Sequence, residues 1–154
     1  SVDSIIVPTC RGDLLWGIYE GFAEAHEANL ISRVPRLFAV EPYPRLERIL
    51  HEGLDYRTKF TQPHHLMVSI GGSTSAYQAL SALERSRGDA CSVTTEETLR
   101  AREEIAALGL YLELSSAAAL AGLYTLVRKK AVQPGERVIM IGTSHGYKEL
   151  QIAS

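Results

Sequence analysis

The chain has 154 residues, of which 45% are hydrophobic and 22% charged, and a formal net charge of −2 at pH 7, which together predict about one globular domain with its own core. Its scattered lysines and arginines offer no basic face for nucleic acid and no polybasic membrane anchor. The chain has two cysteines without CxxC spacing and no apolar run of the roughly 18 residues that a membrane span needs, so we expect a reducing compartment, the cytoplasm.

Hydrophobic periodicity predicts alternating strands and helices along the chain. Strands are predicted at apolar, β-branched runs bounded by turn residues, and helices where apolar residues recur on one helical face. In chain order we predict a strand at residues 5–8, a helix at 14–28, a strand at 36–40, a short helix at 46–51, a helix at 75–86, a strand at 90–93, a helix ending at 108, an extended segment at 110–114, a helix at 117–130 and a strand at 138–141. This order predicts a parallel α/β sheet covered by helices on both faces, a three-layer architecture.

Residues with strong positional preferences predict where several helices begin and end. Asp13 is expected to cap the first helix at its N-terminus. Thr94 and Glu97 have the spacing of a capping box, and Gly109 suits the position just after the same helix. Gly88 is expected to end the helix at residues 75–86.

The first and last strands both end in small, hydroxyl-bearing and glycine residues. In a parallel sheet the strand ends and the following helix N-termini share one edge, so these two turns, at residues 9–13 and 142–146, predict a site for one charged small molecule. Backbone N–H groups of the first turn, with the Thr9 hydroxyl, suit a phosphate. The turn matches neither GxGxxG nor a Walker loop, so the sequence is also compatible with Arg11 as a solvated loop residue and with Gly12 as part of a tight turn.

Further hydroxyl groups and an imidazole lie near the ends of the later elements. Thr143, Ser144 and His145 follow the last strand, where a structural role is as compatible with the sequence as a functional one. Ser115 and Ser116 are expected to cap the alanine-rich helix that follows them.

A long loop is predicted within residues 43–68, around the short helix, and loops of this length are often functional. His64 and His65 lie in it as neighbours, and a metal site would need further ligands that the sequence does not supply, so no metal is expected. Glu113 is expected to be a paired or solvated acid at a strand end. No complete catalytic triad is visible, and no catalytic residue is assigned.

Three segments carry a family resemblance. Residues 7–14, followed by Gly21 and Phe22, resemble Val-Pro-Val-Gly-Asn-Ala-Gly-Asn and a later Gly-Phe. Residues 113–119 are similar to Glu-Pro-Ala-Ser-Ala-Ala, and residues 142–148 to Leu-Thr-Gly-His-Gly-Leu-Lys. These motifs occur in this order in pyridoxal-phosphate enzymes of fold type II, the tryptophan synthase β-like family, and the chain looks most like the threonine synthases over essentially its whole length.

The resemblance implies an incomplete tryptophan synthase β-like large domain that binds pyridoxal 5′-phosphate. It implies that Thr143, beside Ser144, hydrogen-bonds the pyridine nitrogen. A neutral hydroxyl leaves that nitrogen largely unprotonated, which suits β- or γ-elimination or replacement rather than transamination. The implied phosphate contacts come from Thr9, Cys10, Arg11, Gly12 and Asp13.

The first turn departs from the family pattern. Cys10, Arg11 and Asp13 stand where the family has small glycine and asparagine residues. Arg11 is expected either to add a charge-assisted phosphate contact or to accompany a shifted loop. Asp13 would repel a phosphate unless its side chain turns back to cap the helix.

The family's Schiff-base lysine lies in an N-terminal Ser-Phe-Lys type of motif, which these 154 residues lack. The four lysines present occupy other contexts, namely Lys59, Lys129, Lys130 and Lys148. We therefore expect residues 1–154 to form a single domain, the C-terminal cofactor-binding portion of a longer enzyme, inert alone. Its expected partners are the missing N-terminal half, an amino-acid substrate and a second copy in a homodimer.

Two alternatives remain open at this point. One is a non-catalytic α/β module that binds a phosphorylated ligand or a partner subunit. The other is a structural use of the sheet, in which an uncovered edge and apolar face drive self-association.

Overall fold

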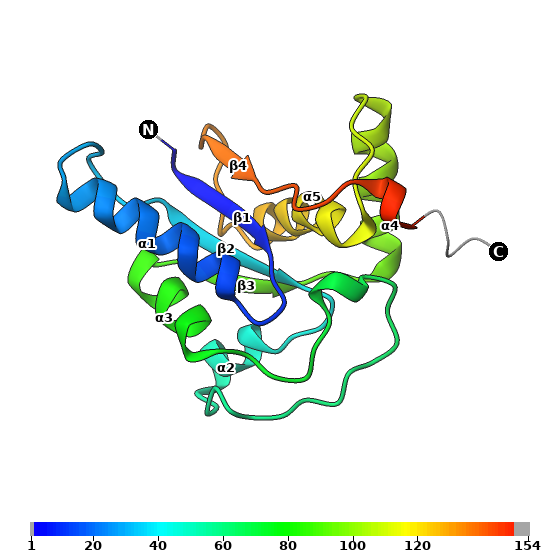
Figure 1. Ribbon diagram of the computed structural model, residues 1–154, viewed down its shortest axis with the longest axis horizontal. Coiled ribbons are helices and arrows are strands. Elements are labelled where there is room, and N and C mark those ends of the chain that lie inside the picture. Colours follow the sequence, from blue (N-terminus) through cyan, green and yellow to red (C-terminus); the bar gives the residue numbers. More distant parts are fainter. Residues whose placement is uncertain (1, 150–154) are drawn as a thin grey trace.

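The computed structural model describes residues 2–149, which contain four strands, five α-helices and two short 3-10 helices (Figure 1). The strands are β1 (Ser4–Pro8), β2 (Arg36–Glu41), β3 (Asp89–Ser92) and β4 (Val138–Met140). The helices are α1 (Asp13–Glu27), α2 (Leu46–Glu52), α3 (Tyr77–Ser86), α4 (Thr95–Ala107) and α5 (Leu114–Arg128). The 3-10 helices are η1 (Val68–Ile70) and η2 (Gly146–Glu149).

The strands form one parallel sheet in the order β3-β2-β1-β4, as the sequence predicts. In its register Ile6 of β1 lies beside Phe38 of β2 and Met140 of β4. Parallel neighbours need long crossovers, which the helices provide. All carboxyl ends of the strands consequently lie at one edge of the sheet.

Helices cover both faces of the sheet, which confirms the three-layer prediction (Figure 1). Successive side chains of a strand point to opposite faces, so Ile5 packs with residues of α1, α2 and α3, whereas Ile6 packs with α4 and α5. Small residues let α5 approach closely: a Cβ added to Gly122 would lie 2.3 Å from a methyl carbon of Val40. No helix in residues 2–149 has the length and apolar character needed to cross a membrane.

The N-terminus of α1 differs from the prediction that Asp13 caps it. The N-cap is Gly12, with φ of 108°, and Asp13 is instead the first helical residue, with no side-chain hydrogen bond capping the helix. Gly12 is buried, and a Cβ there would lie 2.2 Å from the Cβ of Ala79. The turn therefore depends on a glycine in the left-handed region and a tight approach to α3 rather than on a side-chain cap.

The prediction that Ser115 and Ser116 cap the alanine-rich helix is also wrong. Helix α5 begins earlier, at Leu114, and Glu113 is its N-cap without a side-chain hydrogen bond. The two serines lie in the first turn, where their hydroxyls accept from the amides of Ser69 and Ser144 at 3.1 and 2.8 Å. The two serine hydroxyls therefore bind the backbone of neighbouring loops and do not cap the start of the helix.

The structure tests three further helix boundaries, of which the two of α4 agree with the prediction and the end of α3 differs in part. The capping box of Thr94 and Glu97 is present, and Gly109 follows α4 with φ of 87°, as predicted. Helix α3 ends at Ser86, as predicted, and the residue in the left-handed conformation after it is Arg87. Gly88, the predicted terminator, donates its amide to the Leu83 carbonyl at 2.8 Å, and it also packs so closely on β2 that a Cβ would lie 1.7 Å from the Leu37 carbonyl oxygen.

Candidate functional site

A cavity of about 380 Å³ opens at the carboxyl ends of β1 and β4. All seven residues predicted to bind a cofactor line it, which places the two turns of the sequence prediction at one site. The predicted residues in its wall are Thr9, Cys10, Arg11, Gly12, Asp13, Thr143 and Ser144. Its other polar lining residues are Ser69, Glu113 and Lys148.

The loop at residues 9–13 has a strongly ordered backbone. Four successive carbonyl groups accept hydrogen bonds from elsewhere in the protein: those of Thr9 and Cys10 from Arg45 at 3.3 and 3.0 Å, that of Arg11 from Ala76 at 3.0 Å, and that of Gly12 from Trp16 at 2.9 Å. A trans peptide unit points its N–H group opposite to its C=O group. The four N–H groups at residues 10–13 therefore point away from these donors, an arrangement of the kind that binds anions.

The first turn of α1 adds further donors. Trp16 is the first residue whose amide donates back along this helix, to the carbonyl of Gly12. The amides of Asp13, Leu14 and Leu15 precede it and have no acceptor one turn earlier in the helix, and all three residues line the cavity. The positive end of the α1 dipole therefore faces the same space as the loop N–H groups.

Side chains of the loop contribute less than the sequence suggests. The Thr9 hydroxyl, expected to donate to a phosphate, donates instead to the Val7 carbonyl at 2.7 Å. The Cys10 thiol donates to the Gly71 carbonyl. Arg11 and Asp13 are both exposed, so the Asp13 carboxylate lies free at the cavity rather than turned back onto the helix.

The other predicted turn contributes Thr143 and Ser144 to the cavity lining, and the Thr143 hydroxyl is paired with that of Ser116. The Thr143 and Ser116 hydroxyl oxygens lie 2.8 Å apart, and the Ser116 oxygen also accepts from the Ser144 amide at 2.8 Å. The turn is held further by an antiparallel bridge between Leu112 and His145. Ser116 contacts this turn because α5 begins two residues earlier, at Leu114. The prediction that Ser116 caps the helix therefore missed this contact.

Glu113 is a buried acid in the cavity wall. Its side chain is 3% exposed, and its Oε1 atom accepts from the Ser69 hydroxyl. Its Oε2 atom lies 3.7 Å from the Lys148 ammonium and has no hydrogen-bond partner among the described residues. Glu113 is thus paired, one of the two states predicted for it, whereas the position of Lys148 in the cavity lining was not predicted.

Behind the loop lies a second buried pair that the sequence analysis missed. The side chains of Glu41 and Arg45 are 0% exposed, with Oε1 and Nε 3.1 Å apart. The Glu41 Oε2 atom accepts from the amides of Arg45, Leu46 and Glu47 at 3.1, 2.8 and 3.4 Å, which fixes the start of α2. Burial raises the pKa of Glu41 to about 7, although the Arg45 charge and these amides act in the opposite direction.

The histidines singled out in the sequence lie elsewhere. His64 and His65 line a separate surface recess with Thr94 and Thr95, and no group of metal-binding side chains occurs in residues 2–149. His145 is absent from the cavity lining and stacks on Tyr147, with ring centroids 4.5 Å apart.

Comparison with known proteins identifies the family to which the chain is similar. The family model described as pyridoxal-phosphate dependent enzyme matches residues 1–144. The chain is 31% identical over 97% of its length to a threonine synthase of Methanosarcina acetivorans, and 29% identical over 96% to a threonine synthase of Methanocaldococcus jannaschii. It spans 38% of the length of each of these two proteins.

Solved structures with a similar fold are described as amino-acid enzymes. A fungal L-serine ammonia-lyase from Rhizomucor miehei superposes with a TM-score of 0.75 and 21% identity, over 98% of this chain and 49% of that one. Threonine deaminase isoform 2 from Solanum lycopersicum gives a TM-score of 0.72 and 20% identity, over 99% and 45%. These similarities confirm the tryptophan synthase β-like fold.

Proposed function

The chain belongs to the family of pyridoxal-phosphate dependent enzymes, and we propose that it is the C-terminal, cofactor-binding portion of a threonine synthase-like enzyme. The whole enzyme would carry out β- or γ-elimination or replacement on an amino acid. The observation that carries this proposal is the meeting of the loop at residues 9–13 and the Thr143 turn at one cavity.

The described residues fit pyridoxal 5′-phosphate. A cavity of about 380 Å³ is within the range that small-molecule sites occupy, roughly 300–1,000 Å³. The N–H groups of residues 10–13 and the start of α1 form a cradle for a dianionic phosphate, and a side chain at Gly12 would collide with Ala79. When bound, the cofactor supplies an electron sink for the carbanion formed at the substrate.

Thr143 is the proposed partner of the pyridine nitrogen. The Ser116 oxygen accepts from the Ser144 amide, which leaves the Ser116 hydrogen free to be donated to the Thr143 oxygen 2.8 Å away. The Thr143 hydrogen is then available to the cavity. A hydroxyl donor of this kind holds the nitrogen without transferring a proton to it, because a threonine hydroxyl is a very weak acid.

Glu113 and Lys148 give the site its own charges. Glu113 keeps an oxygen without a hydrogen-bond partner among the described residues, and Lys148 faces it at 3.7 Å. We assign neither residue a proton-transfer step. Because no Ser-Phe-Lys type of motif is present, we propose that the chain alone does not turn over an amino acid and depends on the remainder of the enzyme for its covalent lysine.

A titration of the chain with pyridoxal phosphate, followed by absorbance, tests this proposal. Saturable binding that is lost in Thr143→Val would support the proposed site, with Thr95→Val as a matched control outside the cavity. Borohydride reduction and intact mass then ask whether a lysine has reacted. A single specific adduct, at Lys148 for example, would contradict the proposed dependence on an outside lysine, and no saturable binding would contradict the cofactor site.

A further inference from the structure

Arg45 bridges the loop at residues 9–13 to a second loop. Its Nη2 atom donates to the carbonyls of Thr9 and Cys10 at 3.3 and 3.0 Å. Its Nη1 atom donates to the carbonyls of Gly72 and Thr74 at 2.7 and 3.2 Å. Arg45 is not among the residues that line the cavity, so its contact with the site runs through the backbone of the loop.

These contacts fix the direction of two peptide units. The carbonyl of Thr9 and the N–H of Cys10 belong to one planar trans unit, and the carbonyl of Cys10 and the N–H of Arg11 to the next. When Arg45 holds both carbonyls on its own side, both N–H groups point to the other side. Cys10 and Arg11 line the cavity and Arg45 does not, which is consistent with the cavity lying on that other side.

We propose that Arg45 is the positioning residue of the phosphate-binding loop, aiming the amides of Cys10 and Arg11 into the cavity. This inference rests on the proposed function, because the phosphate is the anion that those amides would bind. The buried pair of Glu41 and Arg45 then does more than stabilise the fold, because the Arg45 guanidinium determines whether the loop presents N–H or C=O groups to an anion.

The surroundings of Arg45 hold its guanidinium in one orientation. Glu41 lies 3.1 Å from Nε and is itself fixed by three amides at the start of α2. The Tyr43 ring packs against the guanidinium, with its centroid 5.4 Å from Cζ. A planar fork held in this way can reach carbonyls on two loops at once, whereas a lysine ammonium is a single point charge on a flexible stem.

Arg45→Lys is therefore the informative variant, because it keeps the charge beside Glu41 and removes the fork. We would measure the affinities of the chain for pyridoxal phosphate and for pyridoxal, which lacks the phosphate. The affinity for pyridoxal phosphate should fall about tenfold or more, since hydrogen bonds to a charged group are misdirected. The affinity for pyridoxal should change by less than about twofold, because the Thr143 wall is untouched.

Arg33→Lys is the matched control, since Arg33 is exposed at the opposite end of the sheet and should leave both affinities unchanged. An equal loss for both ligands in Arg45→Lys would show a merely structural role and overturn the proposal, as would no loss for either. If the unsubstituted chain did not prefer pyridoxal phosphate to pyridoxal, the phosphate site itself would be refuted.

A second measurement covers the case in which Arg45→Lys does not fold. Inorganic phosphate is added to the unsubstituted, ¹⁵N-labelled chain, and the amide resonances of Cys10 and Arg11 are followed. A saturable downfield shift of both amide protons is expected if they bind the anion. If the resonances of Cys10 and Arg11 did not change and only other residues shifted, the proposal that these two amides point into the cavity would be refuted.

Discussion

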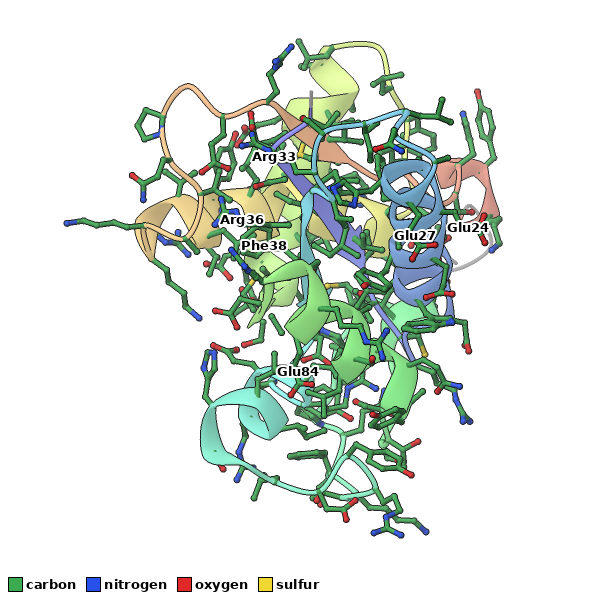
Figure 2. All side chains as sticks on the ribbon, turned by 90° about the vertical axis from the view of Figure 1, so that its left-hand side faces the viewer. Glu24, Glu27, Arg33, Arg36, Phe38 and Glu84 are labelled. Carbon is green, nitrogen blue, oxygen red and sulfur yellow. The ribbon has the colours of Figure 1, made fainter. Side chains whose placement is uncertain are left out.

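The two ends of the sheet differ in what they offer a ligand, and the larger recess is not the one that we propose as the cofactor site. At the amino end a recess of about 770 Å³ is lined by many charged side chains, among them Arg33 and Arg36, which lie at this end in Figure 2. At the carboxyl end the cavity is about 380 Å³. Our proposal for the cofactor site therefore rests on backbone N–H groups and their buried partners and not on volume.

Helix direction explains this contrast. Helices α1 and α5 both begin at the carboxyl end, and residues 13–15 at the start of α1 line the cavity, whereas α1, α3 and α5 end near the amino recess. Basic residues at helix C-termini are favoured by the negative end of the dipole, which gives the cations of the amino recess a structural role. Two of them are also paired: Arg33 with Asp3, and Arg36 with Glu136.

The strongest test of this comparison sets Arg45 against Arg33 in stability. Arg45→Met leaves Glu41 buried without its partner and several carbonyls without a donor, so we expect a loss of about 3–5 kcal/mol in the free energy of unfolding. Arg33→Met, at a side chain 60% exposed, should cost less than about 1 kcal/mol. Urea unfolding measures the loss of unfolding free energy in both variants. Equal losses would contradict the claim that the buried arginine at the carboxyl end differs from the exposed arginine at the amino end.

Two glycines with positive φ sharpen the comparison. Gly12→Ala should cost about 3 kcal/mol, because a strained φ of 108° is combined with a contact of 2.2 Å to the Ala79 Cβ. Gly135→Ala, before β4, has φ of 88° but no atom within 4 Å of the added Cβ, so about 1 kcal/mol is expected. Thermal unfolding compares the variants, and a smaller loss for Gly12→Ala would contradict the tight turn.

The two ends should also respond oppositely to pH. Burial raises the pKa of Glu41 from 4.5 to about 7, so the folded chain binds more protons than the unfolded chain between these values. Its contribution to stability is complete below pH 4.5 and is lost as pH rises through 7, by about 2 kcal/mol between pH 5 and 8. Glu41→Gln should remove this decline in stability, which urea unfolding at several pH values would measure. A decline that persisted in Glu41→Gln would contradict the assignment to Glu41.

Glu136 at the amino end is the opposite case. Burial there is outweighed by hydrogen bonds from Ser4, Gln133 and Arg36, which lower the pKa of Glu136 below 4.5. Its contribution is therefore present above pH 4.5 and lost as pH falls below it. Glu136→Gln should change only this acid limb of the stability curve.

The smallest expected effect concerns Asp13, which lies exposed at the cavity rather than capping α1. Asp13→Asn removes a negative charge near the proposed phosphate and should raise the affinity for pyridoxal phosphate about threefold, more at low salt. Asp3→Asn at the amino end should leave it unchanged. The same titration at two salt concentrations reports both, and a loss of affinity in Asp13→Asn would contradict the proposed phosphate position.

Much of the fold could be predicted because its signals are local. The apolar runs of β1 and β2 and the Thr94–Glu97 capping box each lie within a few residues. The predictions for Asp13 and Ser116 failed because tertiary contacts decided them. Gly12 packs on α3, and the Ser116 hydroxyl serves a turn 28 residues away.

The site was predicted in part for the same reason. Both turns follow apolar strands, and the parallel order brings them to one edge, so Thr9 and Thr143 could be placed together. The role of Arg45 could not be predicted, because its acceptors are backbone carbonyls 36 and 35 residues before it, at Thr9 and Cys10, and such carbonyls leave no mark in a sequence. The sequence offered one signal for the ion pair itself, namely an arginine four positions after Glu41.

The most direct test is a titration of the ¹⁵N-labelled chain with pyridoxal phosphate, with amide resonances followed at both ends of the sheet. We predict saturable shifts at residues 10–13 and at Thr143, and unchanged resonances for Arg33, Arg85 and Arg87, which line the amino recess. Shifts confined to these arginines would place the anion in the amino recess and contradict the assignment of the carboxyl-end cavity as the cofactor site.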